Sequence, residues 1–167
     1  MNNIIQQICE NYISEVLDFF DAGTIRTLDE METELKEKTD IYLRNIMKIY
    51  LEGLDEAIAE DKTGRKKKGY VIEQKAVKRE IYTQFGSLEF NRRYYNNKLN
   101  GTYSYLVDKV VGIESYDRVS GSVSAALVES ASEEAEGTVP SAYFCLYSLL
   151  KSEYLTGSHT ISMLARH

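Results

Sequence analysis

The chain has few of the residues that build disulfide-bonded or zinc-binding domains. Its 167 residues include two cysteines, two histidines, one proline and no tryptophan. Cys9 and Cys145 lie far apart in the sequence, and neither belongs to a CxxC or Cys/His cluster. This pattern is typical of a reduced cytoplasmic protein and argues against a disulfide framework or a zinc site. We therefore expect a cytoplasmic chain with no metal site and no cofactor.

Signal sequences, long apolar runs and catalytic motifs are lacking as well. The start, Met1-Asn2-Asn3, has no charged segment typical of a signal peptide. The longest apolar run, Ala142 to Tyr147, is far shorter than the roughly 20 residues that span a membrane. Gly64 and Gly69 flank a lysine run without the spacing of a phosphate-binding loop. We predict no membrane association and no catalytic residue.

The charges are unevenly distributed. The net charge is −6, but residues 62–98 hold eleven Lys or Arg against three Glu, which gives +8 in that window and −14 elsewhere. One basic segment inside an acidic chain suggests an anionic partner for that segment. An acidic face of the same molecule is an equally physical partner.

Helical periodicity dominates the first third of the chain. Apolar residues recur at helical spacing from Asn3 to about Phe20, and again from Met31 to Ile58. Between these stretches, Thr27 and Glu30 form a capping-box pattern, which predicts the start of a long helix that runs to about Asp61. Two amphipathic helices of this kind are expected to pack on each other or on the rest of the domain.

Strict alternation then predicts a β-hairpin. Residues 77–85 and 88–95 alternate between apolar and polar side chains, and Gly86-Ser87 between them suits a type II′ turn. The expected register places Phe85 opposite Leu88 and Glu80 opposite Arg93 as a cross-strand ion pair. The apolar face of this hairpin would carry Ile81, Phe85, Leu88 and Phe90.

The predicted fold class is α+β and predominantly helical, with an N-terminal amphipathic helix pair, one antiparallel β-hairpin and further helices. Residues 103–111 are read as a short helix or an irregular segment that ends at Gly112, and residues 116–136 as a longer helix. We divide the chain into an amphipathic helical region (1–61), a basic linker with the hairpin (62–102), a helical region (103–136) and a tail of atypical composition (137–167).

The basic segment supplies the candidate binding residues. Its lysines and arginines could neutralise phosphates of a nucleic acid, and a tyrosine beside them could stack on a base. The alternative interpretation is a solvated linker followed by cross-strand ion pairs. The candidate DNA-binding residues are Arg65, Lys66, Lys67, Lys68, Lys78, Arg79, Arg92, Arg93 and Tyr94.

Several short motifs follow one another in a familiar order. They are Gly69-Tyr70-Val71-Ile72, Arg79, the run from Thr83 to Tyr95 (TQFGSLEFNRRYY), Tyr105-Leu106-Val107-Asp108 and Arg118-Val119-Ser120. In this order they resemble the N-terminal region of the Lre-two-type insertion-sequence transposases, a family also catalogued as an uncharacterised protein family. The resemblance covers the chain from its N-terminus to about Glu133.

The resemblance implies a mobile-element protein whose full-length members are longer and carry a downstream carboxylate triad for metal-dependent strand transfer. None of those acidic motifs can be placed on this chain. In the family, a segment after Arg118-Val119-Ser120 suggests a helix-turn-helix, which would be incomplete here. The pattern departs near Glu134, as expected of a truncated or frameshifted copy.

Two functional hypotheses follow. In the first, the chain is a non-catalytic N-terminal fragment of a transposase-like protein that contacts DNA through residues 62–98, or co-assembles with a full-length transposase. In the second, it is a helical oligomerisation module, such as a homo-oligomer, with no role in nucleic-acid binding. Salt-sensitive DNA affinity would favour the first hypothesis, and a concentration-dependent dimer without DNA affinity the second.

Overall fold

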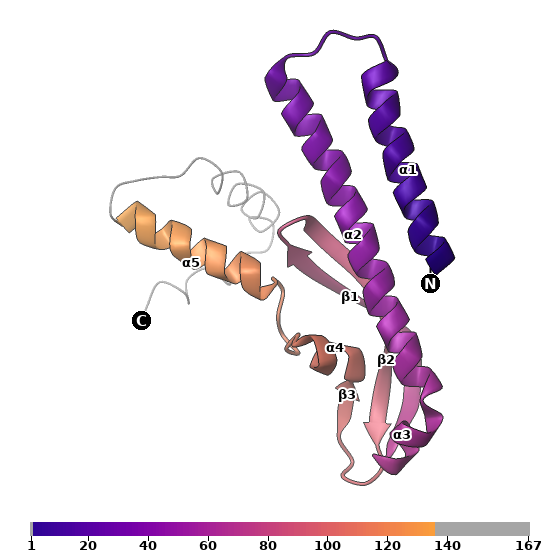
Figure 1. The fold of residues 1–167 in the computed structure, drawn as a ribbon. Helices are drawn as coiled ribbons and strands as arrows, with labels where there is room; N and C mark the ends of the chain where they lie inside the picture. Colours follow the sequence, from indigo (N-terminus) through magenta and orange to yellow (C-terminus); the bar gives the residue numbers. More distant parts are fainter. Residues whose placement is uncertain (1, 136–167) are drawn as a thin grey trace. The chain divides into compact units, whose positions relative to one another are not determined.

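The fold is α+β, as predicted, and the computed structural model describes residues 2–135 of the chain (Figure 1). The described residues up to Ser120 form one compact unit, and the described residues from Gly121 onward belong to a second. The elements in chain order are α1 (Asn2–Asp21), α2 (Leu28–Glu60), α3 (Lys62–Lys67), β1 (Tyr70–Thr83), β2 (Gly86–Asn97), β3 (Tyr103–Tyr105), α4 (Leu106–Val111) and α5 (Gly121–Ala135).

The helices α1 and α2 run antiparallel and side by side (Figure 1). The predicted capping box at Thr27 is confirmed: the Thr27 N–H donates to the Glu30 carboxylate at 2.8 Å, and the Glu30 N–H donates to the Thr27 hydroxyl at 3.3 Å. Farther along, Tyr12 of α1 stacks on Tyr42 of α2 with ring centroids 4.5 Å apart. The Tyr12 and Thr39 hydroxyls share a hydrogen bond of 3.0 Å. These contacts fix the two helices as a pair.

The second half of α2 packs on the sheet. Leu51 of α2 is buried against Ile81 and Leu88 of the β-hairpin, and Phe90 and Val107 complete this core. Met47, Leu54 and Ile58 of α2 extend the same contact. The amphipathic stripe of the long helix therefore has two partners, α1 along its first half and the sheet along its second.

The sheet has three antiparallel strands in the order β1-β2-β3. The predicted hairpin is present, but its register is wrong. Leu88 lies opposite Ile81, not Phe85, and the two-residue loop is Gln84-Phe85, not Gly86-Ser87. The observed partner of Leu88 is four residues away from the predicted one. Because four is an even number, each side chain stays on its predicted face of the sheet, and the alternation of apolar and polar residues fits both registers. Thr83 closes the turn, because its hydroxyl accepts from the Phe85 N–H and donates to the Gly86 carbonyl.

The predicted Glu80–Arg93 ion pair does not form. Glu80 lies opposite Glu89 and accepts a hydrogen bond from the Ser87 hydroxyl. Arg93 does not pair with an acidic residue of β1. Its guanidinium instead forms ion pairs with Asp55 and Glu56 of α2. A pairing argument restricted to the hairpin could not include these acidic partners from a distant helix.

Helix α2 also covers the outer edge of β2. The short strand β3 pairs only with Tyr94, Tyr95 and Asn96, so the preceding part of this edge needs other hydrogen-bond acceptors. The Asn91 N–H donates to the Glu52 carboxylate at 2.9 Å, and the Arg93 N–H donates to the Asp55 carboxylate at 3.1 Å. Two carboxylates one helical turn apart therefore satisfy two successive edge amides of the strand.

The first half of β1 is irregular. Its pairing with β2 shifts between Ile72 and Gln74 and again between Gln74 and Val77, and Ala76 has a positive φ of 54°. Bulges of this kind twist a strand at a sheet edge. At the far end of β1, the Tyr82 N–H donates to the Arg118 carbonyl and the Ser120 N–H donates to the Tyr82 carbonyl, both at 2.8 Å. Residues 118–120 therefore extend the outer edge of β1.

The segment after the hairpin contains one strand that the prediction lacked. Tyr103–Tyr105 forms β3, and only Leu106–Val111 is helical before the predicted stop at Gly112, which has a φ of 74°. The predicted helix from residue 116 to 136 begins later, at Gly121, as α5. The predicted tail of residues 137–167 lies outside the described residues.

Candidate functional site

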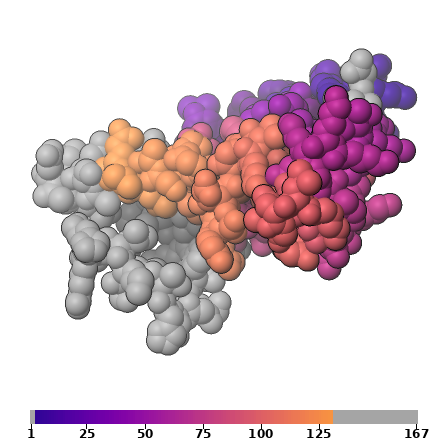
Figure 2. All heavy atoms as spheres, turned by 90° about the horizontal axis from the view of Figure 1, so that it is seen from below, coloured from indigo at the N-terminus to yellow at the C-terminus, as the bar shows by residue number. Residues whose placement is uncertain are grey.

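Exposed lysines gather where α3 meets β1. Lys66 and Lys67 end α3, Lys68 caps it, and Gly69 turns the chain into β1 with a φ of 78°. The Lys98 N–H donates to the Gly69 carbonyl at 2.8 Å, which brings the turn after β2 alongside. Figure 2 shows α3 and this turn side by side on one face. We call Lys66, Lys67, Lys68, Lys75 and Lys98 the lysine surface.

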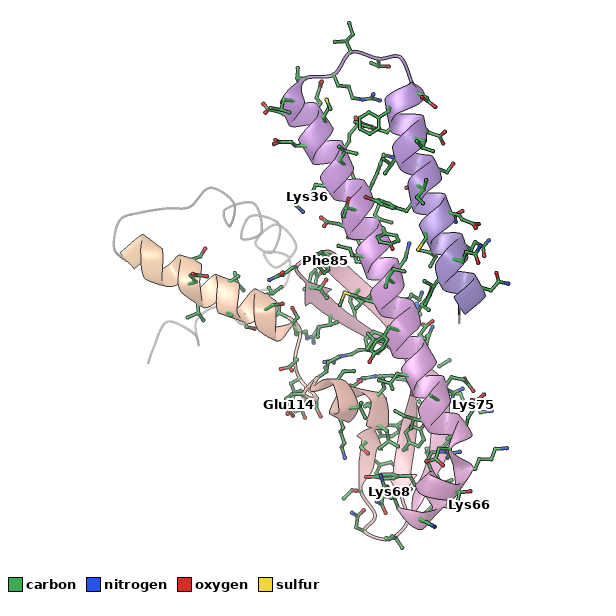
Figure 3. The ribbon with its side chains drawn as sticks, viewed as in Figure 1. Lys36, Lys66, Lys68, Lys75, Phe85 and Glu114 are labelled. Atoms are coloured by element: carbon green, nitrogen blue, oxygen red, sulfur yellow. The ribbon has the colours of Figure 1, made fainter. Side chains whose placement is uncertain are left out.

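The lysine surface lies at one end of the sheet. Figure 3 places Lys66, Lys68 and Lys75 around α3, with Phe85 at the opposite end of the hairpin. All five side chains are exposed, and none forms an ion pair with any residue of the described range 2–135. Their charges are therefore available to a partner in solution, and dissolved salt weakens their interaction with that partner.

The remaining candidates serve the fold in different ways, beginning with Arg65. Its guanidinium donates to the Ala59 carbonyl at 2.7 Å and lies 5.8 Å from the centroid of the Tyr95 ring. Arg65 therefore ties the short helix α3 to the end of α2 and to the buried face of Tyr95. It is partly buried, unlike the three lysines that follow it.

Arg92 is held in the interior. Its guanidinium forms an ion pair with Asp108 of α4, with only 7% and 6% of the two side chains exposed. The guanidinium also lies over the Tyr105 ring, 3.5 Å from the centroid. Burial, with the nearby positive charge of Arg79, lowers the pKa of Arg92 to about 10, so it remains charged at neutral pH.

Arg93 and Arg79 each fasten two segments together. The Arg93 guanidinium donates to Asp55 at 2.7 Å and also pairs with Glu56. Burial alone would lower the pKa of Arg93, but these hydrogen bonds outweigh it and raise the pKa above its usual value. The Arg79 guanidinium donates to the backbone carbonyls of Glu114, Ser115 and Asp117 and so holds the loop after α4 against β1.

Lys78 and Tyr94 complete the predicted set. Lys78 pairs with Glu89 across the hairpin at 3.0 Å, and its side chain is largely exposed. Tyr94 stacks on Tyr103, with centroids 5.4 Å apart, and contacts Tyr105 at a tilt. The structure therefore groups Lys66, Lys67 and Lys68 on an open surface, whereas each of the other six candidates contacts another part of the same chain.

Sequence reasoning missed the acidic and aromatic partners of the arginines. Asp55 and Asp108 are buried, with 3% and 4% of the residue exposed, although both sit in helices of mixed charge. Their position on the apolar side of amphipathic segments was the only available signal. A buried carboxylate is expected to have a charged or hydrogen-bonded partner.

The described residues contain neither a cluster of metal-binding side chains nor a membrane-spanning helix. Between residues 2 and 135, no three His, Cys, Asp or Glu side chains gather closely enough to hold a metal ion. In that same range, no helix is long and apolar enough to cross a membrane.

Comparison with known proteins identifies relatives. The sequence model of an uncharacterised protein family (UPF0236) matches residues 23–142. Curated relatives come from Caldanaerobacter subterraneus subsp. tengcongensis. UPF0236 protein TTE0610/TTE0881/TTE1053/TTE2432 is 37% identical over 134 residues, which are 79% of this chain and 28% of that protein. UPF0236 protein TTE1650/TTE2708 is also 37% identical over 134 residues, 79% of this chain and 27% of that protein.

A third relative from the same organism has a name that joins TTE0033 with ten further designations. It is 35% identical over 134 residues, which are 79% of this chain and 28% of that protein. The matched part therefore spans little more than a quarter of the length of these relatives. No solved structure matches the chain significantly.

Proposed function

The chain belongs to the uncharacterised protein family UPF0236, and from that premise we propose that it is a non-catalytic, N-terminal part of a transposase-like protein that contacts DNA. The contact is made by the lysine surface at the junction of α3 and β1. The observation that carries the proposal is the group of exposed lysines with no ion-pair partner among the described residues, in a chain that is otherwise acidic.

The names of the relatives support a mobile-element origin. One name joins eleven designations from one strain, and two others join four and two. A protein sequence that recurs at several positions of one genome is expected of a mobile element. The resemblance of the Thr83–Tyr95 segment and its neighbours to insertion-sequence transposases points the same way. Any chemistry would then belong to the part of the longer relatives that this chain does not match.

The physical basis of DNA contact is the release of counterions. Each lysine that neutralises a phosphate steepens the dependence of log K on log salt by about 0.9. Lysine is a flexible point charge with a strongly hydrated head, which suits phosphate contact without base readout. We therefore propose that the lysine surface binds duplex DNA of any sequence.

The proposal is tested by fluorescence anisotropy of a labelled random duplex at low and at physiological salt. We expect the full chain to bind, and the triple variant Lys66→Gln, Lys67→Gln, Lys68→Gln to bind about a hundredfold more weakly at 0.15 M salt, since three contacts of slope about 0.9 are lost. The matched control replaces Lys36, Lys38 and Lys48 of α2 by Gln and removes the same charge elsewhere. Equal losses in both triple variants would assign the effect to net charge and contradict the proposal.

A second candidate function is a helical oligomerisation module. The observation that favours it is an apolar stripe on α1, where Ile13, Leu17 and Phe20 are each more than half exposed. Residues at these spacings share one side of a helix and commonly pack against another helix. Light scattering across a wide concentration range tests this candidate. A dimer that Leu17→Gln dissociates, together with no DNA binding at low salt, would favour oligomerisation over DNA contact.

A further inference from the structure

A second cationic site lies at the outer edge of β1, and this inference rests on the proposed function and deepens it. We propose that the pocket between β1 and the loop after α4 binds one phosphate group, supplied by the backbone of the same DNA. Its walls include Lys78 and Arg79 of β1, Arg92 of β2, and Tyr116 and Arg118 of the loop. Arg118 and Tyr116 were not among the residues predicted from the sequence.

The pocket is large enough for a phosphate. It is partly open to solvent and has a cavity volume of about 260 Å³. Ser115 and Tyr116 also line it, and Tyr116 is 94% exposed. A phosphate with part of its sugar therefore fits, with the tyrosine ring free to pack on the sugar or on an adjacent base.

Positive charge dominates the lining. The lining residues include four cations and one carboxylate, that of Glu80, which already accepts a hydrogen bond from Ser87. The cations are Lys78, Arg79, Arg92 and Arg118. Lys78 is partly neutralised by Glu89, but Arg118 is exposed and forms no ion pair with any other residue that the structure describes. Charges of one sign in a concave wall concentrate the field and raise the local concentration of an anion.

The buried arginine has a hydrogen-bond donor without a partner. The Arg92 Nε has no hydrogen-bond partner among the described residues, and only 7% of the side chain is exposed. Asp108 balances one end of the guanidinium. Burial and the positive charge of Arg79 lower the pKa of Arg92, and an anion bound in the pocket would offset the repulsion between these two cations.

The pocket is held in shape before any ligand binds. Three hydrogen bonds from Arg79 to the carbonyls of residues 114, 115 and 117 fix the loop on β1. The Glu114 N–H donates to the Asp117 carboxylate at 2.8 Å and closes the loop on itself, and Figure 3 labels Glu114 there. Backbone bonds between Tyr82 and residues 118–120 anchor its other end. A preorganised site loses less entropy when it binds.

The test uses Arg118→Gln, with Lys109→Gln as the matched control. Lys109 is an exposed cation of α4 outside the pocket, so its replacement removes the same charge. In anisotropy titrations with the labelled random duplex, Arg118→Gln should lower the salt slope by about one and the affinity at 0.15 M salt about fivefold, as the loss of one phosphate contact predicts. Lys109→Gln should change neither. Equal slopes in the two variants would overturn the inference while leaving the lysine surface untouched.

A second experiment distinguishes a DNA phosphate from free phosphate as the ligand. Inorganic phosphate and a mononucleotide are titrated into the ¹⁵N-labelled full chain, and the amide resonances of Ser115, Tyr116 and Arg118 are followed. A phosphodiester site predicts small shifts at high concentration and a larger effect from a short duplex. If the duplex does not bind and free phosphate shifts these amides, the proposed function fails and a free-phosphate pocket remains. No shift with any probe would overturn the pocket itself.

Discussion

The substitution Asp108→Asn should strongly lower the free energy of unfolding. Asp108 is the carboxylate that balances Arg92, and both side chains are more than nine-tenths buried. The Asp108→Asn variant keeps the shape and leaves a buried cation without its counter-charge. Loss of one partner of a buried ion pair costs about 3–5 kcal/mol.

Burial and Arg79 lower the pKa of Arg92 to about 10 in the unaltered chain, so the guanidinium that Asp108 balances is charged at neutral pH. A domain of this size has a free energy of unfolding of about 5–15 kcal/mol, so the variant should lose a large share of its stability.

Urea denaturation followed by far-UV circular dichroism measures the effect. With a slope of about 1–3 kcal/mol/M, a loss of 3 kcal/mol or more lowers the midpoint by at least about 1 M. The variant Arg92→Met removes the other partner, and the double variant completes a cycle. The losses of unfolding free energy in the two single variants should add up to more than the loss in the double variant, because the double variant buries no unpaired charge. Strictly additive values would refute the reasoning.

Three further changes test the fold. Asp55→Asn removes the carboxylate that accepts from both the Arg93 backbone and its guanidinium, and should cost about 3 kcal/mol in urea denaturation, whereas Glu56→Gln, at an exposed position, should cost less than about 1 kcal/mol. Thr27→Ala removes the cap of α2 and should cost about 1 kcal/mol by the same assay, and an unchanged midpoint would contradict a stabilising capping box. Gly69→Ala should cost more than Gly101→Ala in thermal unfolding: both residues have positive φ, but a Cβ on Gly69 would lie 2.5 Å from Leu99 Cγ, whereas a Cβ on Gly101 has no atom within 4 Å.

Local patterns predicted the first two helices, α1 and α2, but not the short helix α3, which lies in the predicted linker. The capping box at Thr27 and the apolar spacing up to Ile58 determine α2 without any tertiary information, because caps and amphipathic faces are properties of nearby residues. The hairpin was also found, since alternation is local. Its turn was misplaced because Gly86 suits a type II′ loop, whereas the Thr83 hydroxyl shapes a turn that lies two residues earlier.

Long-range partners could not be read from the sequence. The sequence predicted a cross-strand pair of Arg93 with Glu80, whereas the fold brings Asp55 and Glu56, which are 38 and 37 residues away, to Arg93. The same limit applied to Arg92 and Asp108, and to the pocket that joins β1 with Tyr116 and Arg118. The lysine run was visible at once because three adjacent charges need no tertiary contact to be recognised.

The most direct test of the central proposal is the salt slope of duplex binding for the full chain and for the Lys66→Gln, Lys67→Gln, Lys68→Gln variant. If the lysine surface contacts phosphates, the plot of log K against log salt should be steep for the unaltered chain and shallower by about three for the variant. The Lys36, Lys38 and Lys48 control should keep the original slope. A full chain that does not bind at low salt, or a variant with an unchanged slope, would contradict DNA contact through this surface.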